Sequence, residues 1–146
     1  MYLFDTREKS NDHIKLYFAR HNIPYAVQKL DVGDYMTSTG NISIDRKQSL
    51  DELAANLMTK DHTRFWNEIR RAKESGIKLI ILCEHGGKVK SLPDVAKWNS
   101  RYSKIKGVDL MKELYRIHIS YGVEILFCSK RSTGKKIVEL LGGSVD

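Results

Sequence analysis

The sequence predicts an α/β sandwich, in which a mixed β-sheet lies between layers of helices. Segments with a helical repeat of apolar residues alternate along the chain with short segments suited to strands. The run Ile77–Cys83 is almost wholly apolar, which is typical of a central strand covered on both faces. The chain has 146 residues, a common domain size, so we expect one domain over residues 1–146.

In the first half of the chain we expect, in order, a strand over 2–5, a helix over 10–21, a strand over 25–30 and a hairpin that pairs 35–37 with 42–44. Ser10 stands where the helix needs an N-cap. Pro24 ends that helix, because proline cannot continue it. The hairpin is predicted because Ser38-Thr39-Gly40-Asn41 contains residues that tolerate a positive φ at little steric cost.

In the second half we expect a helix that begins at Ser49, its continuation from Asp61 to Gly76, the strand Ile77–Cys83, a helix over 108–121, a strand over 123–128 and a helix over 132–141 that ends at Gly142-Gly143. Ser49 and Glu52 have the spacing of a capping box. The residues that should face the core recur at helical spacing: Leu50, Leu53, Leu57, Phe65, Ile69 and Ala72.

Positive charge is concentrated in one segment of the chain. The 25 basic and 18 acidic residues give a formal charge of +7. Between Gly86 and Gly107 the only acid is Asp94, whereas the segment carries Lys88, Lys90, Lys97, Arg101, Lys104 and Lys106. It also holds Trp98 and Tyr102 and has no clean helical or strand period, so we expect a loop. Basic side chains interleaved with aromatic ones suit phosphate contacts and base stacking. The alternative is a solvated, mobile loop.

Several classes of protein are excluded by the composition. No stretch approaches the roughly 20 apolar residues that span a bilayer, and no leader opens the chain, so we expect an intracellular protein, cytoplasmic or in the nucleoid or nucleus. Cys83 and Cys128 lie in apolar runs and should be reduced core thiols. Ser132-Thr133-Gly134-Lys135-Lys136 lacks the leading glycines of a phosphate-binding loop, so we expect a helix start and no nucleotide cofactor.

Two acidic residues should meet across the hairpin. If the turn centres on Thr39-Gly40, Asp34 lies opposite Asp45, with Cβ atoms roughly 4.5–5.5 Å apart. Side chains alternate along a strand, so Lys47 shares the face of Asp45 while Arg46 points to the other face. Two carboxylates this close repel each other unless a cation lies between them, and oxygen ligands suit Mg²⁺ or Mn²⁺. The alternative is a hairpin that carries ordinary solvent-facing charges.

Such a site suits the hydrolysis of a phosphodiester bond. A divalent ion held by two carboxylates lowers the pKa of bound water and polarises a phosphate oxygen. Lys47 would add a point charge that orients the water or stabilises the developing anion. The products would be a 3′-hydroxyl and a 5′-phosphate.

The spacing of these residues resembles a family motif. Gly33-Asp34, then Asp45-Arg46-Lys47 and Asp51 follow the pattern Gly-Asp-(x)n-Glu-Arg-Lys-x3-Asp of the nuclease domain of the XPF family of structure-specific DNA endonucleases, a branch of the PD-(D/E)xK superfamily. The opening Asp5-Thr6-Arg7-Glu8 is similar to the family's Asp-x-Arg-Glu. The likeness is strongest over 2–51. Asp45 stands where the family has Glu, one methylene longer.

The resemblance implies a restriction-endonuclease-like three-layer sandwich and a set of site residues. Asp34 and Asp45 would hold Mg²⁺, which Mn²⁺ could replace, with the backbone carbonyl of Arg46 as a further ligand. The remaining candidate catalytic residues are Lys47, Asp5, Glu8, Arg46 and Asp51. Asp51 is equally explained as a helix N-terminal acid, and Glu8 as an acid in the first turn of a helix. The candidate DNA contacts are Arg7, Arg64, Lys88, Lys90, Lys97, Arg101, Lys104 and Lys106.

The resemblance also implies the partners. It suggests branched DNA such as flaps, forks and four-way (Holliday) junctions, in repair, recombination or resolution, and a homodimer formed through the nuclease domains. The paired helix-hairpin-helix module that usually follows is not found within the 146 residues, so we expect a self-contained domain. Two alternatives stay open: a catalytically silent DNA-binding subunit of the same fold, and an RNA-processing nuclease.

Overall fold

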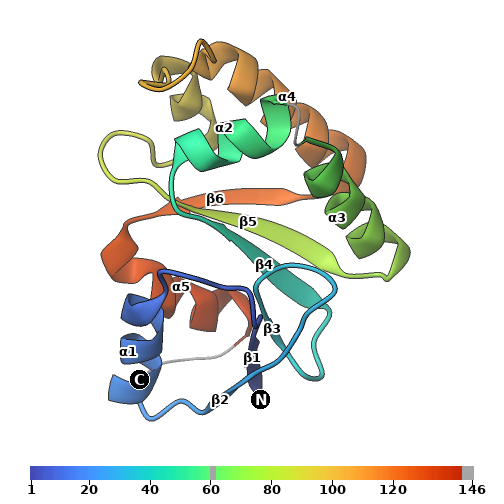
Figure 1. Cartoon of the computed structure of the whole chain (residues 1–146), viewed down its shortest axis with the longest axis vertical. Coiled ribbons are helices and arrows are strands. Elements are labelled where there is room, and N and C mark those ends of the chain that lie inside the picture. Colours follow the sequence, from blue (N-terminus) through green and yellow to red (C-terminus); the bar gives the residue numbers. More distant parts are fainter. Residues whose placement is uncertain (60–61, 143–146) are drawn as a thin grey trace.

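The computed structural model describes residues 1–59 and 62–142 and contains one six-stranded mixed sheet (Figure 1). The strand order is β2-β1-β3-β4-β5-β6. The pairs β1/β3 and β3/β4 are antiparallel, whereas β1/β2, β4/β5 and β5/β6 are parallel. The strands are β1 Tyr2–Phe4, β2 Tyr25–Val27, β3 Tyr35–Thr37, β4 Ile42–Lys47, β5 Lys78–Glu84 and β6 Glu124–Cys128.

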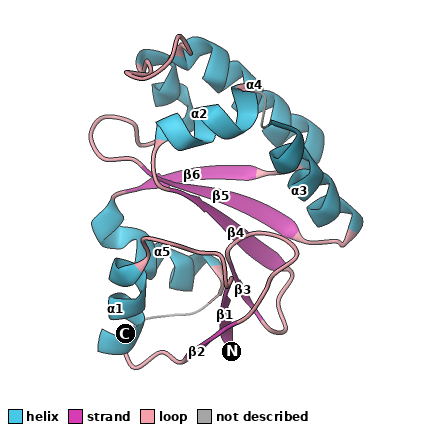
Figure 2. Cartoon of the chain, viewed as in Figure 1, coloured by secondary structure: helices cyan, strands magenta, loops and turns pink. Residues whose placement is uncertain are grey.

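Helices cover both faces of this sheet, which confirms the predicted sandwich (Figure 2). One layer contains α1 and α5, and the other contains α2, α3 and α4. The helices are α1 Asp12–Arg20, α2 Leu50–Met58, α3 His62–Glu74, α4 Gly107–Tyr121 and α5 Thr133–Leu140, with short 3-10 helices η1 Leu92–Lys97 and η2 Lys130–Ser132. None of the helices within the described residues is long and apolar enough to cross a bilayer.

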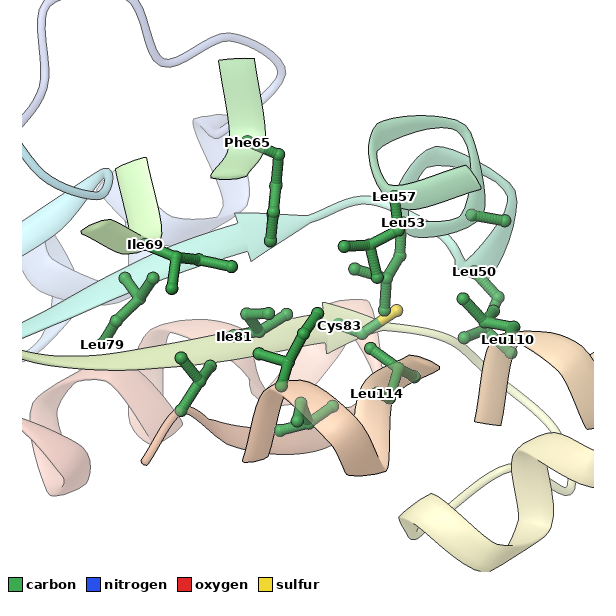
Figure 3. Packing of buried hydrophobic residues seen from close by; sticks show 14 of the residues in the cluster. Leu50, Leu53, Leu57, Phe65, Ile69, Leu79, Ile81, Cys83, Leu110 and Leu114 are labelled. Atoms are coloured by element: carbon green, nitrogen blue, oxygen red, sulfur yellow. The ribbon is translucent and has the colours of Figure 1, made fainter. Parts of the chain in front are cut away.

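The strand β5 contributes to a hydrophobic core on each face of the sheet, as its apolar sequence predicts. Ile81 and Cys83 pack under α2, α3 and α4, together with all six residues expected to face the core (Figure 3). Ile80 and Leu82 pack on the other face with residues of α1 and α5. The two cysteines are free thiols, as expected. The core therefore fixes β4, the neighbour of β5, between two well-packed layers.

Two of the expected boundaries are wrong, and two others lie outside the described residues. The second strand ends at Val27 rather than at residue 30, because side chains of the N-terminal segment bind the backbone of Leu30. The first helix begins at Asp12 behind an Asn11 cap, and Ser10 instead has a φ of 53°. The expected helix start at Asp61 and the second glycine of the pair 142–143 fall outside the described residues.

The basic segment between Gly86 and Gly107 is more regular than a loop. It contains η1, and Asn99 forms an isolated bridge with Lys106. Trp98 packs against the core, whereas Tyr102 is 84% exposed. Short 3-10 turns leave no long hydrophobic period in a sequence, which explains why this structure was not predicted.

Candidate active site

The hairpin brings Asp34 and Asp45 together as the sequence predicts. Tyr35 and Ile44 form the last pair of the β3/β4 ladder, and Asp34 and Asp45 are the next residues of the two segments. The Asp34 amide donates to the Ile44 carbonyl at 2.7 Å, and the Arg46 amide donates to Oδ2 of Asp34 at 2.8 Å. These bonds fix both the backbone and the carboxylate of Asp34.

The glycine before Asp34 is required by its surroundings. Gly33 has a φ of 72°, a conformation that other residues rarely adopt. A Cβ at this position would lie 2.1 Å from Oγ of Ser43, and that hydroxyl donates to the Val32 carbonyl. Glycine is therefore needed before Asp34, because the backbone at this position passes very close to Ser43 of β4.

Successive residues of β4 serve opposite faces of the sheet. Asp45 and Lys47 are buried, and Nζ of Lys47 lies 3.1 Å from Oδ1 of Asp45. Nζ also lies 4.9 Å from the ring centroid of Phe65 on α3. Although burial opposes it, the charges of Asp45 and Asp34 raise the pKa of Lys47, so the side chain is a fixed ammonium group.

A pocket of about 810 Å³ opens beside these residues. It lies between β4 and the helices α2 and α3, and five of the seven candidate catalytic residues line it, as does Arg64. The lining residues are Glu8, Asp34, Asp45, Arg46, Lys47, Glu52, Asn56, Thr63, Arg64, Phe65, Asn67 and Glu68.

Glu68 is the acidic residue that the sequence analysis missed. Burial, the charge of Asp45 and a hydrogen bond with Asp45 together raise the pKa of Glu68 to about 10. Its Oε1 atom is buried without a hydrogen-bond partner among the described residues. The sequence gives only a weak signal for Glu68. It directly precedes the buried Ile69, so it lies at the border between the apolar face of α3 and the face that lines the pocket.

The crowded carboxylates suit a divalent cation. Burial, followed by the charges of Asp45 and Glu8, raises the pKa of Asp34 well above its usual value. Within the described residues no three His, Cys, Asp or Glu side chains form a ready-made metal cluster. Mg²⁺ does not need one, because it is commonly bound by one or two carboxylates together with waters and substrate phosphates. Asp34 and Asp45 therefore fit Mg²⁺, and Glu68 lies close enough to feel the charges of both.

The Arg46 guanidinium is engaged by buried partners on the other face of β4. It donates to Glu84 at 2.7 Å and to Glu8 at 2.9 Å, and also to the carbonyls of Lys9 and Ser10. Although burial opposes it, the bonds to Glu84 and the nearby Glu8 raise the pKa of Arg46. Arg46 therefore holds Glu8 in place, and its proposed carbonyl contact with a metal stays a prediction.

Glu84, at the end of β5, is the centre of a buried polar network. It accepts hydrogen bonds from Arg46 and from the hydroxyl of Thr133, and it contacts Nε2 of His13 at 2.5 Å. Although burial works in the opposite direction, these bonds hold the pKa of Glu84 below its usual value. Thr133 begins α5, as expected for a helix start rather than a phosphate-binding loop.

Two predicted acids do not join the group in the pocket. The carboxylate of Asp5 is occupied by the Arg7 guanidinium at 2.9 Å and the Leu30 amide at 2.7 Å. Although burial opposes it, these bonds lower the pKa of Asp5. Asp51 accepts a hydrogen bond from Ser100 at 2.6 Å and lies in the first turn of α2. Asp5 and Asp51 do not line the pocket, and each braces a neighbouring segment. Their catalytic roles stay predictions.

The candidate DNA contacts of the basic segment are all exposed. This segment follows β5, whose carboxyl end lies at the same sheet edge as Lys47, because β4 and β5 are parallel and Lys47 pairs with Cys83. The bond between Ser100 and Asp51 then anchors the segment beside α2. The exposed residues are Lys88, Lys90, Lys97, Arg101, Lys104 and Lys106. Arg7 is also exposed but is paired with Asp5.

Comparison with known proteins gives one family and one fold. The sequence profile of the ERCC4 domain matches residues 4–141. XPF from Aeropyrum pernix has 19% identity and a TM-score of 0.72, over 97% of this chain and 64% of that chain. XPF from Aeropyrum pernix in complex with DNA has 20% identity and a TM-score of 0.72, over 96% and 62%. The chain thus spans less than two thirds of the XPF chains it resembles. No curated protein sequence matches it.

Proposed function

The chain belongs to the ERCC4 domain family, and from this premise we propose that it is a Mg²⁺-dependent endonuclease that hydrolyses phosphodiester bonds in DNA. The observation that carries the proposal is the meeting of Asp34, Asp45 and Lys47 in one pocket of about 810 Å³. A crowded pair of carboxylates with a fixed ammonium group beside it matches the needs of phosphate chemistry.

In the proposed mechanism each residue of the pocket has one task. Asp34 and Asp45, with the Arg46 carbonyl, would hold Mg²⁺, which when bound lowers the pKa of water and polarises a phosphate oxygen. Lys47 is held 3.1 Å from Asp45 and would stabilise the charge that develops on the phosphoryl oxygens. Glu68 would hold the Asp45 carboxylate in place through the hydrogen bond between the two side chains. Mn²⁺ would replace Mg²⁺ at these oxygen ligands.

We infer that the substrate is branched DNA and that the protein acts as a homodimer. The exposed basic segment supports the first inference, because its lysines and its arginine offer phosphate contacts outside the pocket. An apolar stripe on α4 supports the second: Val108, Tyr115 and Ile119 share one helical face, and Ile119 is 78% exposed. Sedimentation of the wild type and of Ile119→Asp tests the dimer, since a monomeric wild type would contradict it.

The decisive experiment compares cleavage of labelled flap, fork, four-way junction and linear duplex DNA, with Mg²⁺ and with EDTA. Asp34→Asn should reduce the cleavage rate by about 100-fold or more while DNA binding persists. Asp31→Asn, an exposed acid in the preceding loop, is the control and should cut normally. Binding without cutting by the wild type would favour the silent subunit, and faster cutting of matched RNA junctions would favour RNA processing.

A further inference from the structure

A second hollow lies on α3 and α4, and its lining shares no residue with the candidate active site. Its volume is about 340 Å³. Figure 1 shows that both helices cover the same face of the sheet. His62, Trp66 and Arg70 follow one another at four-residue spacing on α3, so they form one stripe. The residues facing them from α4 are Arg116, Ser120 and Tyr121.

Aromatic rings form one part of this hollow. The ring centroids of Trp66 and Tyr121 are 5.5 Å apart with an interplanar angle of 62°. The Arg116 guanidinium lies 5.6 Å from the Trp66 centroid and is also held by the carboxylate of Glu113. Arg116 is therefore oriented before any ligand arrives, which lowers the cost of binding one.

The charge of the hollow is positive and partly uncompensated. Its lining includes two arginines and a histidine, and none of its six residues is acidic. The side chain of Arg70 forms no hydrogen bond or ion pair with the described residues. A planar guanidinium that is free to donate is well suited to a phosphate group. The alternative is that the contact between Arg116 and Trp66 only holds α3 and α4 together. That alternative gives no role to Arg70 or to the hollow.

We propose that this hollow binds one nucleotide of a single-stranded DNA segment, with its phosphate on Arg70 and Arg116 and its base against Trp66 and Tyr121. Arginines beside exposed aromatic faces are the usual combination in single-strand binding sites. A base in a duplex stays stacked between its neighbours and cannot reach recessed rings, whereas a base in a flap or gap can. The volume is at the small end of ligand pockets, which suits a single nucleotide.

The helix α3 connects the hollow with the candidate active site. Arg64 and Glu68 of this helix line the large pocket, and Trp66 and Arg70 line the small one. A single strand that leaves the large pocket across α3 would therefore meet the second site. The inference rests on the proposed function for the choice of DNA as the ligand, whereas binding itself does not require cleavage.

The test uses the whole protein in EDTA, so that no strand is cut. In a Trp98→Phe variant, Trp66 is the only tryptophan, and titration with a dodecamer of thymidylate at fixed salt should quench its fluorescence. Arg70→Gln should weaken binding by about 10-fold in fluorescence anisotropy, because a charge-assisted phosphate contact is lost. Arg20→Gln removes the same charge from the opposite layer of helices and is the matched control.

Two results with the thymidylate dodecamer would overturn the inference: unchanged Trp66 fluorescence while anisotropy shows binding, or equal weakening of binding by Arg70→Gln and Arg20→Gln. Two comparison ligands, a DNA duplex of the same length and a dodecamer of uridylate, give two more. Equal affinity for the duplex, or tighter binding of the uridylate dodecamer, would also overturn the inference. Quenching by the single strand in a protein that never cuts DNA would support this site and contradict the nuclease proposal. The two proposals therefore fail separately.

Discussion

Replacing Glu68 with glutamine should change how the stability of the metal-free protein depends on pH. The pKa of Glu68 is raised to about 10, far above the value of a carboxyl in the unfolded chain. Between these two values the folded protein holds a proton that the unfolded chain has released. Stability must therefore fall as the pH rises through this window. Glutamine keeps the shape of the side chain but cannot titrate, so the variant should lose this dependence.

The size of the effect follows from the linkage between protonation and folding. One proton that is retained only in the folded state changes the free energy of unfolding by about 1.4 kcal/mol per pH unit. From pH 6 to pH 9 the wild type should lose up to about 4 kcal/mol more than Glu68→Gln. For a domain of this size that corresponds to a difference in Tm of about 8 to 16 °C over the same range. Glu68 interacts with Asp34 and Asp45, and replacing Glu68 also changes the surroundings of these two acids. The differences in free energy and in Tm are therefore upper limits.

The assay is urea unfolding of wild type and Glu68→Gln at several pH values in EDTA. Glu74→Gln, an exposed acid at the end of the same helix, is the control and should follow the wild type. Saturating Mn²⁺ should flatten the wild-type slope, because the cation takes the place of the proton. Parallel pH profiles for wild type and Glu68→Gln would refute the argument that Glu68 is crowded by the acids of the pocket.

Two further substitutions test the frame around the site by urea unfolding. Gly33→Ala should lower the free energy of unfolding by more than about 2 kcal/mol, because the new Cβ would clash with Ser43 and the residue must also keep a positive φ. Gly76 has a similar φ but open space around it, so Gly76→Ala should lower the free energy of unfolding by only about 1 kcal/mol. Equal losses for the two variants would exclude the clash. Glu84→Gln leaves the Arg46 charge without its main partner and should cost about 3 kcal/mol or more, and a loss below 1 kcal/mol would show that Glu8 alone satisfies the guanidinium.

The acidic pair of the hairpin could be predicted because its determinants are local. Ser38-Thr39-Gly40-Asn41 fixes the turn, and the alternation of the flanking strands then fixes which residues face each other. The apolar run of β5 similarly reveals a strand that is covered on both faces. In both cases the signal lies within a few consecutive residues.

The remaining features depend on contacts between distant parts of the chain. Glu68 joins the pocket only because α3 crosses β4, and nothing in the spacing of the sequence links Glu68 to Asp45. The second strand is short because Asp5 and Arg7 bind the backbone of Leu30, some 25 positions away. A side chain that replaces a sheet hydrogen bond leaves no mark on hydrophobic periodicity.

The alternation along β4 also protects the protein against misfolding by strand slippage. Asp45 and Lys47 require the polar cleft, and Arg46 requires the two carboxylates on the opposite side. A shift of β4 by one residue would turn all three charged side chains toward the wrong layer. Each would then be buried without a counter-ion, which would lower the stability by several kcal/mol per side chain. The same three residues thus also select a unique alignment of the central strands.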